Sequence, residues 1–250
     1  MMNSWVGIGR SDIGLVRTSN QDAFATLDRI GFWAVADGMG GHVGGAIAAQ
    51  TAIASVRAQV ELLADPLHQG HGVPAAFLTD LIIQAHDAIM GRASLESTLK
   101  GMGTTIVMLF IHSAPIPTAH VAHLGDSRAY RFRSGILTAL TRDHTLIEKY
   151  LKHGILTKAS ARTHPERHVL TRALGMSLPV KPDVTSYPLQ QDDLLILCSD
   201  GLTKMLEDED IQEICTDAKG DPIQACDRLI AESLTRGGED NVTVVAIAHT

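Results

Sequence analysis

The stretch that decides the fold is Leu194-Leu195-Ile196-Leu197-Cys198, which leads directly into Ser199-Asp200-Gly201. An apolar run of this kind, bounded by a turn signal, predicts a strand that is buried in the core. A charged side chain at the end of such a strand lies close to the core, where an ionised carboxylate needs a partner. Asp200 is therefore the first candidate functional residue.

Three further apolar, strand-like runs carry an aspartate at their edge. They are residues 31–36 followed by Asp37, residues 120–125 followed by Asp126, and residues 241–247 preceded by Asp240. Buried strands bring their ends together, and several carboxylates at one end of a sheet cannot all stay ionised and unpaired. A hard divalent cation resolves this conflict, because Mg²⁺ and Mn²⁺ prefer carboxylate, carbonyl and water oxygens. The pattern predicts a metal site and, from it, a hydrolase.

The composition indicates an acidic globular protein. The chain has 250 residues, 45% of them apolar, and a net charge of -7 from 21 basic and 28 acidic side chains. This length and apolar fraction allow a sizeable core. We find no repeat, low-complexity tract or linker, so we predict a single domain over residues 1–250. The acidic balance argues against a sequence-independent grip on nucleic acid, which needs a basic surface.

The cysteines and the N-terminus indicate a cellular compartment. Cys198, Cys215 and Cys226 form no Cys-x-x-Cys pair, which fits a reduced cytosolic interior and not a disulfide scaffold or zinc site. Residues 1–7 lack a basic region followed by a long apolar core, and no apolar stretch approaches the length of a membrane span. We expect a soluble, cytoplasmic, monomeric protein without membrane contact.

The hydrophobic pattern predicts helices in pairs and strands joined by short turns. Helices are expected from near Gly44, from near Pro74, and over residues 208–215 and 222–234. Strands are expected over residues 23–27, 32–36, 104–111, 118–124, 129–132, 136–141, 184–187, 194–198 and 242–248. This order predicts an α+β fold in which two mostly antiparallel β-sheets form a central sandwich, flanked on each side by a pair of helices, in α-β-β-α layers. Residues from about 145 to 173 are expected to form an irregular, flap-like segment.

Two polar clusters near the N-terminus suggest chemistry, although each has a simpler interpretation. Asp37-Gly38-Met39-Gly40-Gly41-His42 offers a carboxylate next to a glycine carbonyl, a natural pair of oxygen ligands, but also fits a turn that caps the next helix. In Arg17-Thr18-Ser19-Asn20-Gln21-Asp22, the arginine fork suits a phosphate and Asp22 could orient metal-bound water. Taken alone, this second cluster is more typical of a polar turn before the strand at residues 23–27.

The later clusters also allow two interpretations. Residues 125–128, Gly-Asp-Ser-Arg, fit an ordinary turn with a surface ion pair, and residues 237–241 fit a helix end followed by a turn. Among the histidines, His120 and His123 fall on opposite faces of one strand and are interpreted as packing or sheet-surface residues. His164 and His168 are expected in a solvated loop near the rim of the site, where contact with a substrate peptide is the alternative.

Taken together, the clusters resemble the metal-dependent serine/threonine protein phosphatases of the protein phosphatase 2C family, in particular its bacterial branch. The resemblance covers nearly the whole chain, from Ser11 to Ile247, with the motifs in the family's order and spacing, and it implies the same layered sandwich. The matching stretches are residues 12–14, 17–22, 37–42, 103–105, 125–128, 168–175, 199–203 and 239–243.

The resemblance implies a role for each acidic position. Asp37 bridges two metal ions and the Gly38 carbonyl binds one of them. Asp200 and Asp240 bind the other ion, while Asp126 with Asp200 forms a third, weaker site. The resemblance further implies that Asp22, with Gln21, holds metal-bound water and that Arg17 receives the substrate phosphate.

The expected mechanism is direct hydrolysis. Two Mn²⁺ or Mg²⁺ ions about 3.5–4 Å apart activate a shared water, and the resulting hydroxide attacks phosphorus in line, without a phospho-enzyme. The leaving serine or threonine oxygen then takes a proton from His42 or from metal-bound water. Two positions depart from the family pattern. Gln21 replaces a common glutamate, which lowers the negative charge near the metals, and Met39 replaces a histidine of eukaryotic members.

Three functions are weighed against one another. The leading one is a phosphatase of phosphoserine and phosphothreonine in proteins that opposes a bacterial serine/threonine kinase. The alternatives are a catalytically silent, phosphatase-like binding module and a metal phosphohydrolase of small phosphate esters. The complete set of aspartates favours an active enzyme over a silent module.

Overall fold

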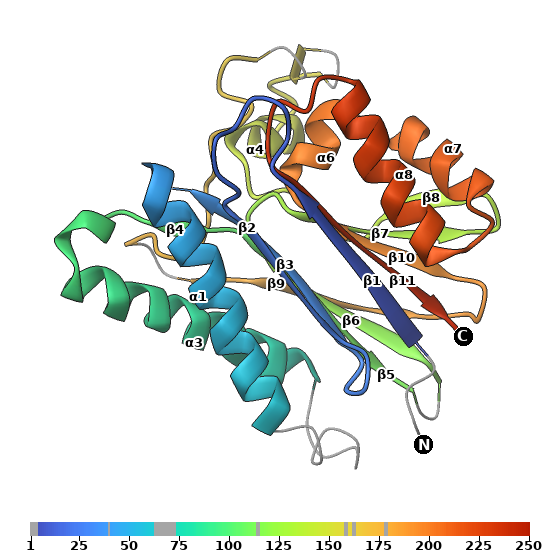
Figure 1. Ribbon diagram of the computed structural model, residues 1–250, viewed down its shortest axis with the longest axis horizontal. Coiled ribbons are helices and arrows are strands. Elements are labelled where there is room, and N and C mark those ends of the chain that lie inside the picture. Colours follow the sequence, from blue (N-terminus) through green and yellow to red (C-terminus); the bar gives the residue numbers. More distant parts are fainter. Residues whose placement is uncertain are drawn as a thin grey trace.

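Two antiparallel sheets pack face to face at the centre of the molecule and carry helices on their outer faces (Figure 1). The computed structural model describes residues 5–39, 41–62, 74–113, 116–157, 160–161, 164–177 and 180–250. Within these ranges the layers run helix, sheet, sheet, helix. The α+β sandwich predicted from the sequence is therefore confirmed.

The first sheet has five strands in the order β1-β11-β10-β7-β8. Their bounds are β1 Trp5–Asp12, β7 Arg128–Arg133, β8 Ile136–Ala139, β10 Leu194–Cys198 and β11 Val242–His249. Side chains alternate between two buried faces along β11. Val245 and Ile247 face the other sheet, while Val244 and Ala246 face the helices. Burial on both faces explains why this strand is apolar at nearly every position.

The second sheet has six strands, with β2-β3-β5-β6-β9 in order and a short β4 that pairs with β3. Their bounds are β2 Asp22–Leu27, β3 Phe32–Met39, β4 Gly103–Thr104, β5 Ile106–His112, β6 Thr118–Leu124 and β9 Asp183–Pro188. β3 runs three residues beyond the predicted end at Ala36, because Gly38 and Met39 pair with β4. The extension matters for function, since it places Asp37 inside the sheet.

Two long helices cover the six-stranded sheet, and three shorter ones cover the five-stranded sheet (Figure 1). The bounds are α1 Gly41–Leu62, α3 Pro74–Leu95, α4 Leu146–Lys152, α6 Asp200–Met205, α7 Asp208–Asp217 and α8 Pro222–Thr235, with a 3₁₀ turn η1 at Ser97–Leu99. α1 and α3 pack on the six-stranded sheet, whereas α6, α7 and α8 pack on the other. None of the helices in the described ranges is both long and apolar enough to cross a bilayer.

Two elements differ from the sequence expectation. β1 was not predicted, because Gly7 and Gly9 interrupt the apolar alternation; these glycines leave room for the rings of Trp33 and Phe24, and a Cβ on Gly7 would lie 2.1 Å from Trp33 Nε1. α6 was also not predicted, because no helix or strand was assigned between residues 199 and 207. The chain instead enters a helix directly at Asp200.

Candidate metal centre

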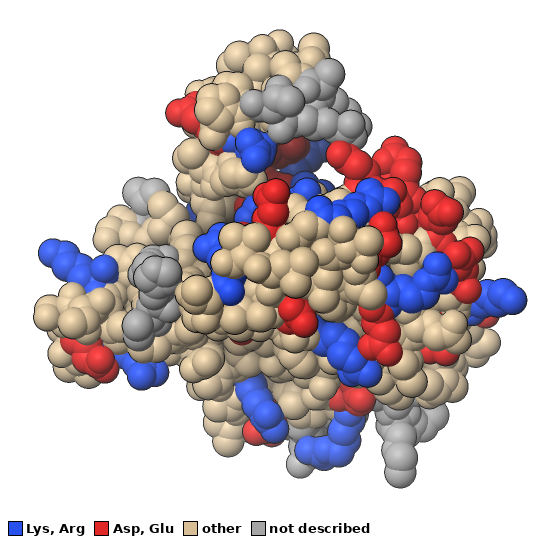
Figure 2. Space-filling model, turned by 45° about the horizontal axis from the view of Figure 1, so that its top comes forward, with Lys and Arg blue, Asp and Glu red and all other residues tan. Residues whose placement is uncertain are grey.

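The predicted acidic residues meet at one end of the sandwich. Asp37 in β3 is the register partner of Asp22 at the start of β2. Asp126 follows β6, Asp200 follows β10 and Asp240 precedes β11. These strand ends surround a cavity of about 360 Å³ that is lined by Arg17, Gln21, Asp37, Gly38, Met39, Thr105, Asp126, His168, Leu170, Asp200, Lys204, Asp240 and Asn241. Figure 2 shows acidic and basic side chains gathered around a hollow on this face of the molecule.

Asp37 is fixed by its backbone, which leaves its carboxylate available. Its N–H donates to Thr105 Oγ1 at 3.2 Å, and its carbonyl accepts from the Thr105 N–H at 2.9 Å and from Thr104 Oγ1 at 2.8 Å. The side chain is deeply buried among other carboxylates. Burial therefore raises the pKa of Asp37 well above its usual value, and the charges of Asp22 and Asp200 raise it further.

Asp126 is a second buried carboxyl in the same cavity. Asp126 follows the apolar run at residues 120–125, as expected, and it is about nine-tenths buried. Burial raises the pKa of Asp126, and the negative charge of Asp200 acts in the same direction. Two acids whose ionisation is suppressed by a shared environment form a site that a cation would stabilise.

Asp22 lies behind the cavity, held by hydroxyl groups of the opposite sheet. Its Oδ2 accepts from Ser199 Oγ at 2.8 Å and from Thr243 Oγ1 at 2.7 Å. Burial raises the pKa of Asp22, although these two hydrogen bonds oppose the shift. Its Oδ1 is buried and has no hydrogen-bond partner among the described residues. This unused oxygen suits a water molecule held next to a metal site.

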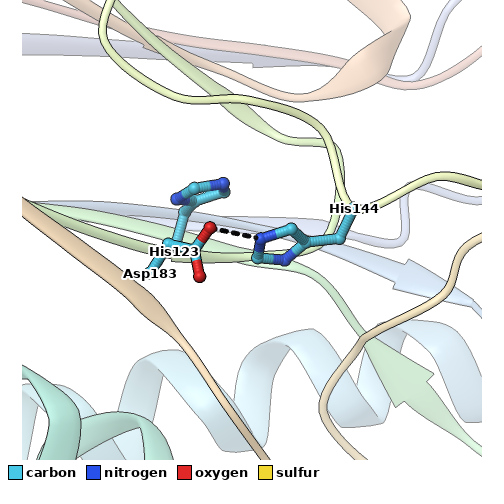
Figure 3. A group of neighbouring side chains, drawn as sticks. All are labelled: His123, His144 and Asp183. Atoms are coloured by element: carbon cyan, nitrogen blue, oxygen red, sulfur yellow. Dashed lines mark hydrogen bonds and ion pairs between the residues drawn. The ribbon is translucent and has the colours of Figure 1, made fainter. Parts of the chain in front are cut away.

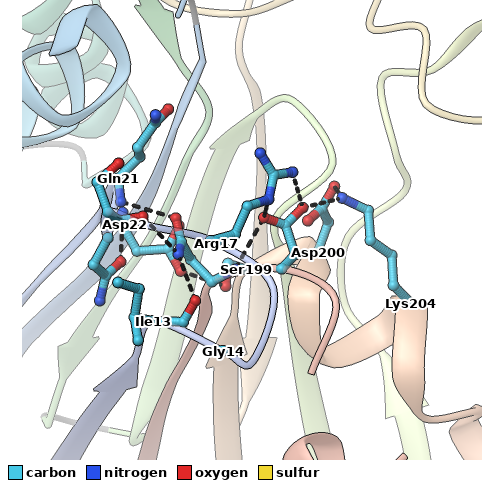
Figure 4. Close-up of polar contacts among 12 residues, drawn as sticks. Ile13, Gly14, Arg17, Gln21, Asp22, Ser199, Asp200 and Lys204 are labelled. Atoms are coloured by element: carbon cyan, nitrogen blue, oxygen red, sulfur yellow. Dashed lines mark hydrogen bonds and ion pairs between the residues drawn. The ribbon is translucent and has the colours of Figure 1, made fainter. Parts of the chain in front are cut away.

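Asp200 and Asp240 are the carboxylates that already carry cationic partners. Lys204 Nζ lies 2.6 Å from Asp200 Oδ2 and 2.7 Å from Asp240 Oδ2. Arg17 binds Asp240 with two nitrogens, Nε to Oδ1 at 2.9 Å and Nη2 to Oδ2 at 2.9 Å. Figure 4 shows Arg17 and Lys204 approaching the carboxylates from opposite sides. Although burial favours the neutral acid, the Lys204 ammonium holds the pKa of Asp240 below its usual value.

The Gln21–Gly38 region closes the cavity on the side of the six-stranded sheet. The Gly38 N–H donates to the Gln21 carbonyl at 3.2 Å, and the Gln21 N–H donates to Asn241 Oδ1 at 2.9 Å. Gly38 packs against the start of α1, and a Cβ at this position would lie 2.1 Å from the Gly45 carbonyl oxygen. A glycine is therefore required here for the helix to approach the strand.

The donor set fits hard divalent cations. Asp22, Asp37, Asp126, Asp200 and Asp240 supply carboxylate oxygens within one region, which is the ligand type that Mn²⁺ and Mg²⁺ prefer. Asp200 Oδ1, like Asp22 Oδ1, is buried without a hydrogen-bond partner among the described residues. Buried, unsatisfied carboxylate oxygens are costly unless something binds them. A bound cation would satisfy them and remove the repulsion between the carboxylates.

The structure therefore brings together all but one of the side chains that the sequence pointed to. Of the predicted residues, Arg17, Gln21, Asp37, Gly38, Asp126, Asp200 and Asp240 line the cavity, and Asp22 lies directly behind it. The side chain of His42 lies outside the described part of the chain, so its role as proton donor stays a prediction.

Two cavity residues were missed or assigned elsewhere by sequence reasoning. Lys204 gave no signal, because α6 was not predicted; in a helix it lies one turn after Asp200, which brings the two side chains together. His168 was expected in a solvated loop. It is exposed, as expected, but it also lines the cavity.

A separate group of three side chains, His123, His144 and Asp183, also has the composition of a metal site (Figure 3). Its hydrogen bonds argue against one. The Gly125 N–H donates to His144 Nδ1 at 3.2 Å, and His144 Nε2 faces Asp183 Oδ2 at 3.1 Å and Arg172 Nη1 at 3.2 Å. A metal cation on Nε2 would therefore be repelled by the Arg172 guanidinium. Arg172 Nη1 also lies 3.0 Å from Asp183 Oδ1, where it supplies the positive charge.

These residues instead connect the segment 145–173 to the strand that precedes Asp126. The His144 N–H donates to the Gly125 carbonyl at 2.9 Å, and the Thr171 N–H donates to the His144 carbonyl at 2.7 Å. The Leu146 N–H donates to the Val169 carbonyl at 2.8 Å. Both ends of the segment are thus fixed next to the cavity. Between them lie α4 and several turns, which fits the irregular character predicted for this stretch.

Comparison with known proteins identifies close relatives along nearly the whole chain. Residues 9–236 match the family described as Protein phosphatase 2C. The serine/threonine phosphatase stp of Listeria monocytogenes is 35% identical over 246 residues, which cover 95% of this chain and 93% of the relative. The serine/threonine protein phosphatase PstP of Mycobacterium tuberculosis is 36% identical over 240 residues, which cover 94% of this chain and 43% of that longer protein.

A solved structure shows the same arrangement of elements. The crystal structure of the catalytic domain of the phosphatase PstP in complex with two manganese ions superimposes with a TM-score of 0.83 at 33% identity. The superposition covers 98% of this chain and 97% of that one. The layered sandwich is therefore shared with a structure that holds two manganese ions.

Proposed function

The chain belongs to the protein phosphatase 2C family and is a metal-dependent protein serine/threonine phosphatase, and from this premise we propose that the carboxylates around the 360 Å³ cavity hold its metal ions. Asp37 and the Gly38 carbonyl would hold the first ion, and Asp37, Asp200 and Asp240 would hold the second. Asp126, together with Asp200, binds a third and weaker ion. The observation that supports this assignment is the meeting of these oxygens at one cavity, with Asp200 Oδ1 buried and unsatisfied among the described residues.

The ions and the protein side chains have different tasks. Two Mn²⁺ or Mg²⁺ ions, when bound, activate a water for in-line attack on phosphorus and neutralise charge on the phosphate oxygens. Asp22 fixes the water next to them through its unsatisfied Oδ1, because its Oδ2 is already held by Ser199 and Thr243. Gln21, the preceding residue, would offer that water an amide hydrogen bond without adding charge.

Arg17 receives the substrate phosphate. Its side chain is about half exposed at the mouth of the cavity, and its guanidinium already binds a carboxylate with two nitrogens. A phosphate offers the same two-oxygen geometry, and a guanidinium matches it well. A metal ion held by Asp240 would compete with Arg17 for that carboxylate, which would leave the guanidinium available to the phosphate.

The leaving serine or threonine oxygen needs a proton. We assign this task to His42, the second residue of α1. A histidine suits this role because its ordinary pKa lies close to neutral pH. The assignment rests on sequence position.

The substrates are proteins phosphorylated on serine or threonine, supplied by a cognate serine/threonine kinase. The segment 145–173 contacts those substrates as a flap, since its ends are fixed at the cavity and His168 lines the cavity wall. We place the enzyme in the cytoplasm as a monomer and a single catalytic domain over residues 1–250. Three buried free cysteines support a reducing compartment.

Hydrolysis of a phosphothreonine peptide, measured with Mn²⁺ and with EDTA, tests the assignment. We expect turnover with Mn²⁺ and its loss after complete chelation. Asp37→Asn and Asp200→Asn should each lower kcat by at least about 10³-fold, because each removes a charge that the ions require, while circular dichroism remains that of the wild type.

Two outcomes would contradict the proposal. Near-normal turnover by either variant would remove that aspartate from the metal site. A higher kcat/KM for a small phosphate ester than for the phosphopeptide would favour the alternative of a small-ester phosphohydrolase. Asp217→Asn, an exposed aspartate at the end of α7, is the matched control and should retain full activity.

A further inference from the structure

Lys204 occupies an unusual place for a lysine. Its ammonium lies between Asp200 Oδ2 at 2.6 Å and Asp240 Oδ2 at 2.7 Å, and its side chain is only 23% exposed. Both carboxylates are mostly buried, with 17% and 16% of their side chains exposed. These are the two aspartates that the proposed function assigns to one metal ion. The Lys204 ammonium therefore contacts the same carboxylate oxygens that this metal ion would bind.

The local fold forces this arrangement. β10 ends at Cys198, and α6 begins at Asp200 without an intervening loop. In a helix, residues four apart project from the same face, so Lys204 reaches back over Asp200. Asp240 lies on the neighbouring strand end. The ion pairs of Lys204 therefore join α6 to the loop before β11.

An ammonium ion and a divalent cation exclude each other at this position. The Asp240 Oδ2 atom accepts hydrogen bonds from both Lys204 and Arg17, so its lone pairs are already engaged. A divalent ion placed a few ångströms from the Lys204 ammonium would also be repelled by it. Binding of the metal to both carboxylates therefore requires that Lys204 moves away.

The structure offers Lys204 a destination. A second cavity of about 490 Å³ lies on the other side of Lys204, Asp126 and Asp200, which line both cavities. Its wall contains further acidic side chains from α7 and the neighbouring loops, namely Glu207, Asp208, Glu209 and Glu239, together with the cationic side chains of Arg128 and Arg167. A rotation about the flexible lysine stem would move the ammonium from the first cavity into the second.

We propose that Lys204 is a built-in competitor of the metal ions, whose ammonium joins Asp200 to Asp240 in the metal-free protein and leaves them when a divalent cation binds. The pairing stabilises the empty site and lowers the affinity for metal. It rests on the proposed function in one respect, which is that Asp200 and Asp240 are ligands of the same ion.

The first test compares Mn²⁺ binding by isothermal titration calorimetry in the wild type, Lys204→Gln and Lys204→Met. Both variants should bind Mn²⁺ about tenfold more tightly, which corresponds to about 1.4 kcal/mol. Their EDTA-treated forms should melt at a lower temperature than wild type, because Asp200 loses its cationic partner and Asp240 keeps only Arg17. Lys100→Gln, an exposed lysine after the 3₁₀ turn, is the matched control and should change neither quantity.

A second test needs no substitution. Acetylation of lysines in the full-length wild type, followed by mass spectrometry, should show Lys204 labelled several-fold faster after Mn²⁺ is added, while Lys100 is labelled equally fast in both states. Wild-type or weaker Mn²⁺ affinity in the variants would overturn the proposal. So would unchanged labelling of Lys204, or a wild type that binds no Mn²⁺ at millimolar concentration.

These readouts separate the inference from the proposed function. Metal affinity and lysine labelling do not depend on turnover. A protein that shows both effects but hydrolyses no phosphopeptide would support the role of Lys204 and contradict the substrate assignment. A fully active enzyme whose Lys204 variants bind Mn²⁺ like the wild type would do the opposite.

Discussion

Backbone hydrogen bonds hold Gln21 in the cavity, so its position does not depend on whether the side chain is neutral or charged. Its carbonyl accepts from the Gly38 N–H, and its own N–H donates to Asn241 Oδ1. Its side-chain oxygen lies against α1, where a Cβ on Gly45 would be 2.1 Å away. Glutamate has the same length and shape as glutamine. A glutamate would therefore fit this position and add one negative charge to the metal site.

Gln21→Glu should bind Mn²⁺ more tightly than the wild type, by about three- to tenfold, because a full charge a few ångströms from a cation is worth about 1 kcal/mol or more at the edge of a protein. Calorimetric titration measures the change. Gln84→Glu, at an exposed position of α3, is the matched control with the same change of net charge. Equal affinities in wild type and Gln21→Glu would show that the charge of this residue does not reach the ions.

His144 illustrates how burial fixes the state of a titrating residue. Burial lowers the pKa of His144 to about 4, and the neighbouring His123 acts in the same direction. The neutral ring is what allows Nδ1 to accept from the Gly125 N–H. In the unfolded chain the pKa of histidine is about 6.5. Between these values the unfolded chain binds a proton that the folded protein does not.

The free energy of unfolding should therefore fall as pH decreases from about 6.5 to 4, by up to about 3 kcal/mol from His144 alone. Urea denaturation of the EDTA-treated protein at pH 7 and pH 5 measures this loss. His144→Gln should be less stable at pH 7 but lose less stability between the two pH values, since other titrating groups contribute equally to both proteins. Parallel pH profiles for the two proteins would contradict the assignment.

Among the elements, β1 shows why an edge strand can escape a sequence pattern. Its register with β11 is complete from Trp5 to Asp12, yet Gly7 and Gly9 remove two side chains from the alternation. The reason is tertiary, since the rings of Trp33 and Phe24 occupy the space where side chains would be. A local pattern carries no information about which ring will fill such a space.

Gly7→Ala should destabilise the protein by about 1–3 kcal/mol, because the new methyl group collides with a buried tryptophan ring that has little freedom to move. Gly91→Ala is the matched control. Gly91 lies on α3 with no atom within 4 Å of an added Cβ, so alanine there should stabilise the helix by about 0.5–1 kcal/mol. Urea denaturation measures both changes. A Gly7→Ala protein as stable as the wild type would mean that the β1 edge repacks freely.

α6 accounts for what sequence reasoning missed at the site. Asp200 was predicted from the buried strand before it, since a charge at that position needs a partner. The helix that starts at the same residue is only six residues long, too short for its periodicity to stand out. Lys204 belongs to that helix, and its contact with Asp200 depends on the helical turn that separates the two residues. Asp200 could therefore be predicted as a metal ligand, whereas Lys204, the proposed competitor of the metal, could not.

For the whole molecule, the sequence predicted most of what depends on periodicity. Apolar strands, paired helices and the four-layer arrangement follow from burial on one or two faces, and the aspartates at strand ends indicated the site. The clustering itself required the register between strands far apart in sequence, such as β10 with β7 and β10 with β11. Contacts with the segment 145–173 required the hydrogen bonds of His144, for which the sequence carried no pattern.

Metal binding should stabilise the whole molecule, because the site joins the ends of both sheets. A ligand that binds the folded state adds about 2.7 kcal/mol per site at a concentration of one hundred times its Kd. The melting temperature should therefore rise with Mn²⁺ concentration and return to its starting value with EDTA. Asp37→Asn should show a much smaller rise. A Mn²⁺-independent melting temperature in the wild type would contradict the metal site.

The pairing of β1 with β11 has a consequence for how the chain is connected. Trp5 is the register partner of His249, and their rings contact edge to face with centroids 5.4 Å apart, so the two ends of the fold lie side by side (Figure 1). Joining them with a short Gly-Ser linker costs little entropy. New ends can then be opened at the β7–β8 hairpin, where Ser134 and Gly135 form an exposed turn. A circularly permuted enzyme of this kind would keep every strand pairing while its synthesis begins with β8, at the edge of the five-stranded sheet that lies opposite β1.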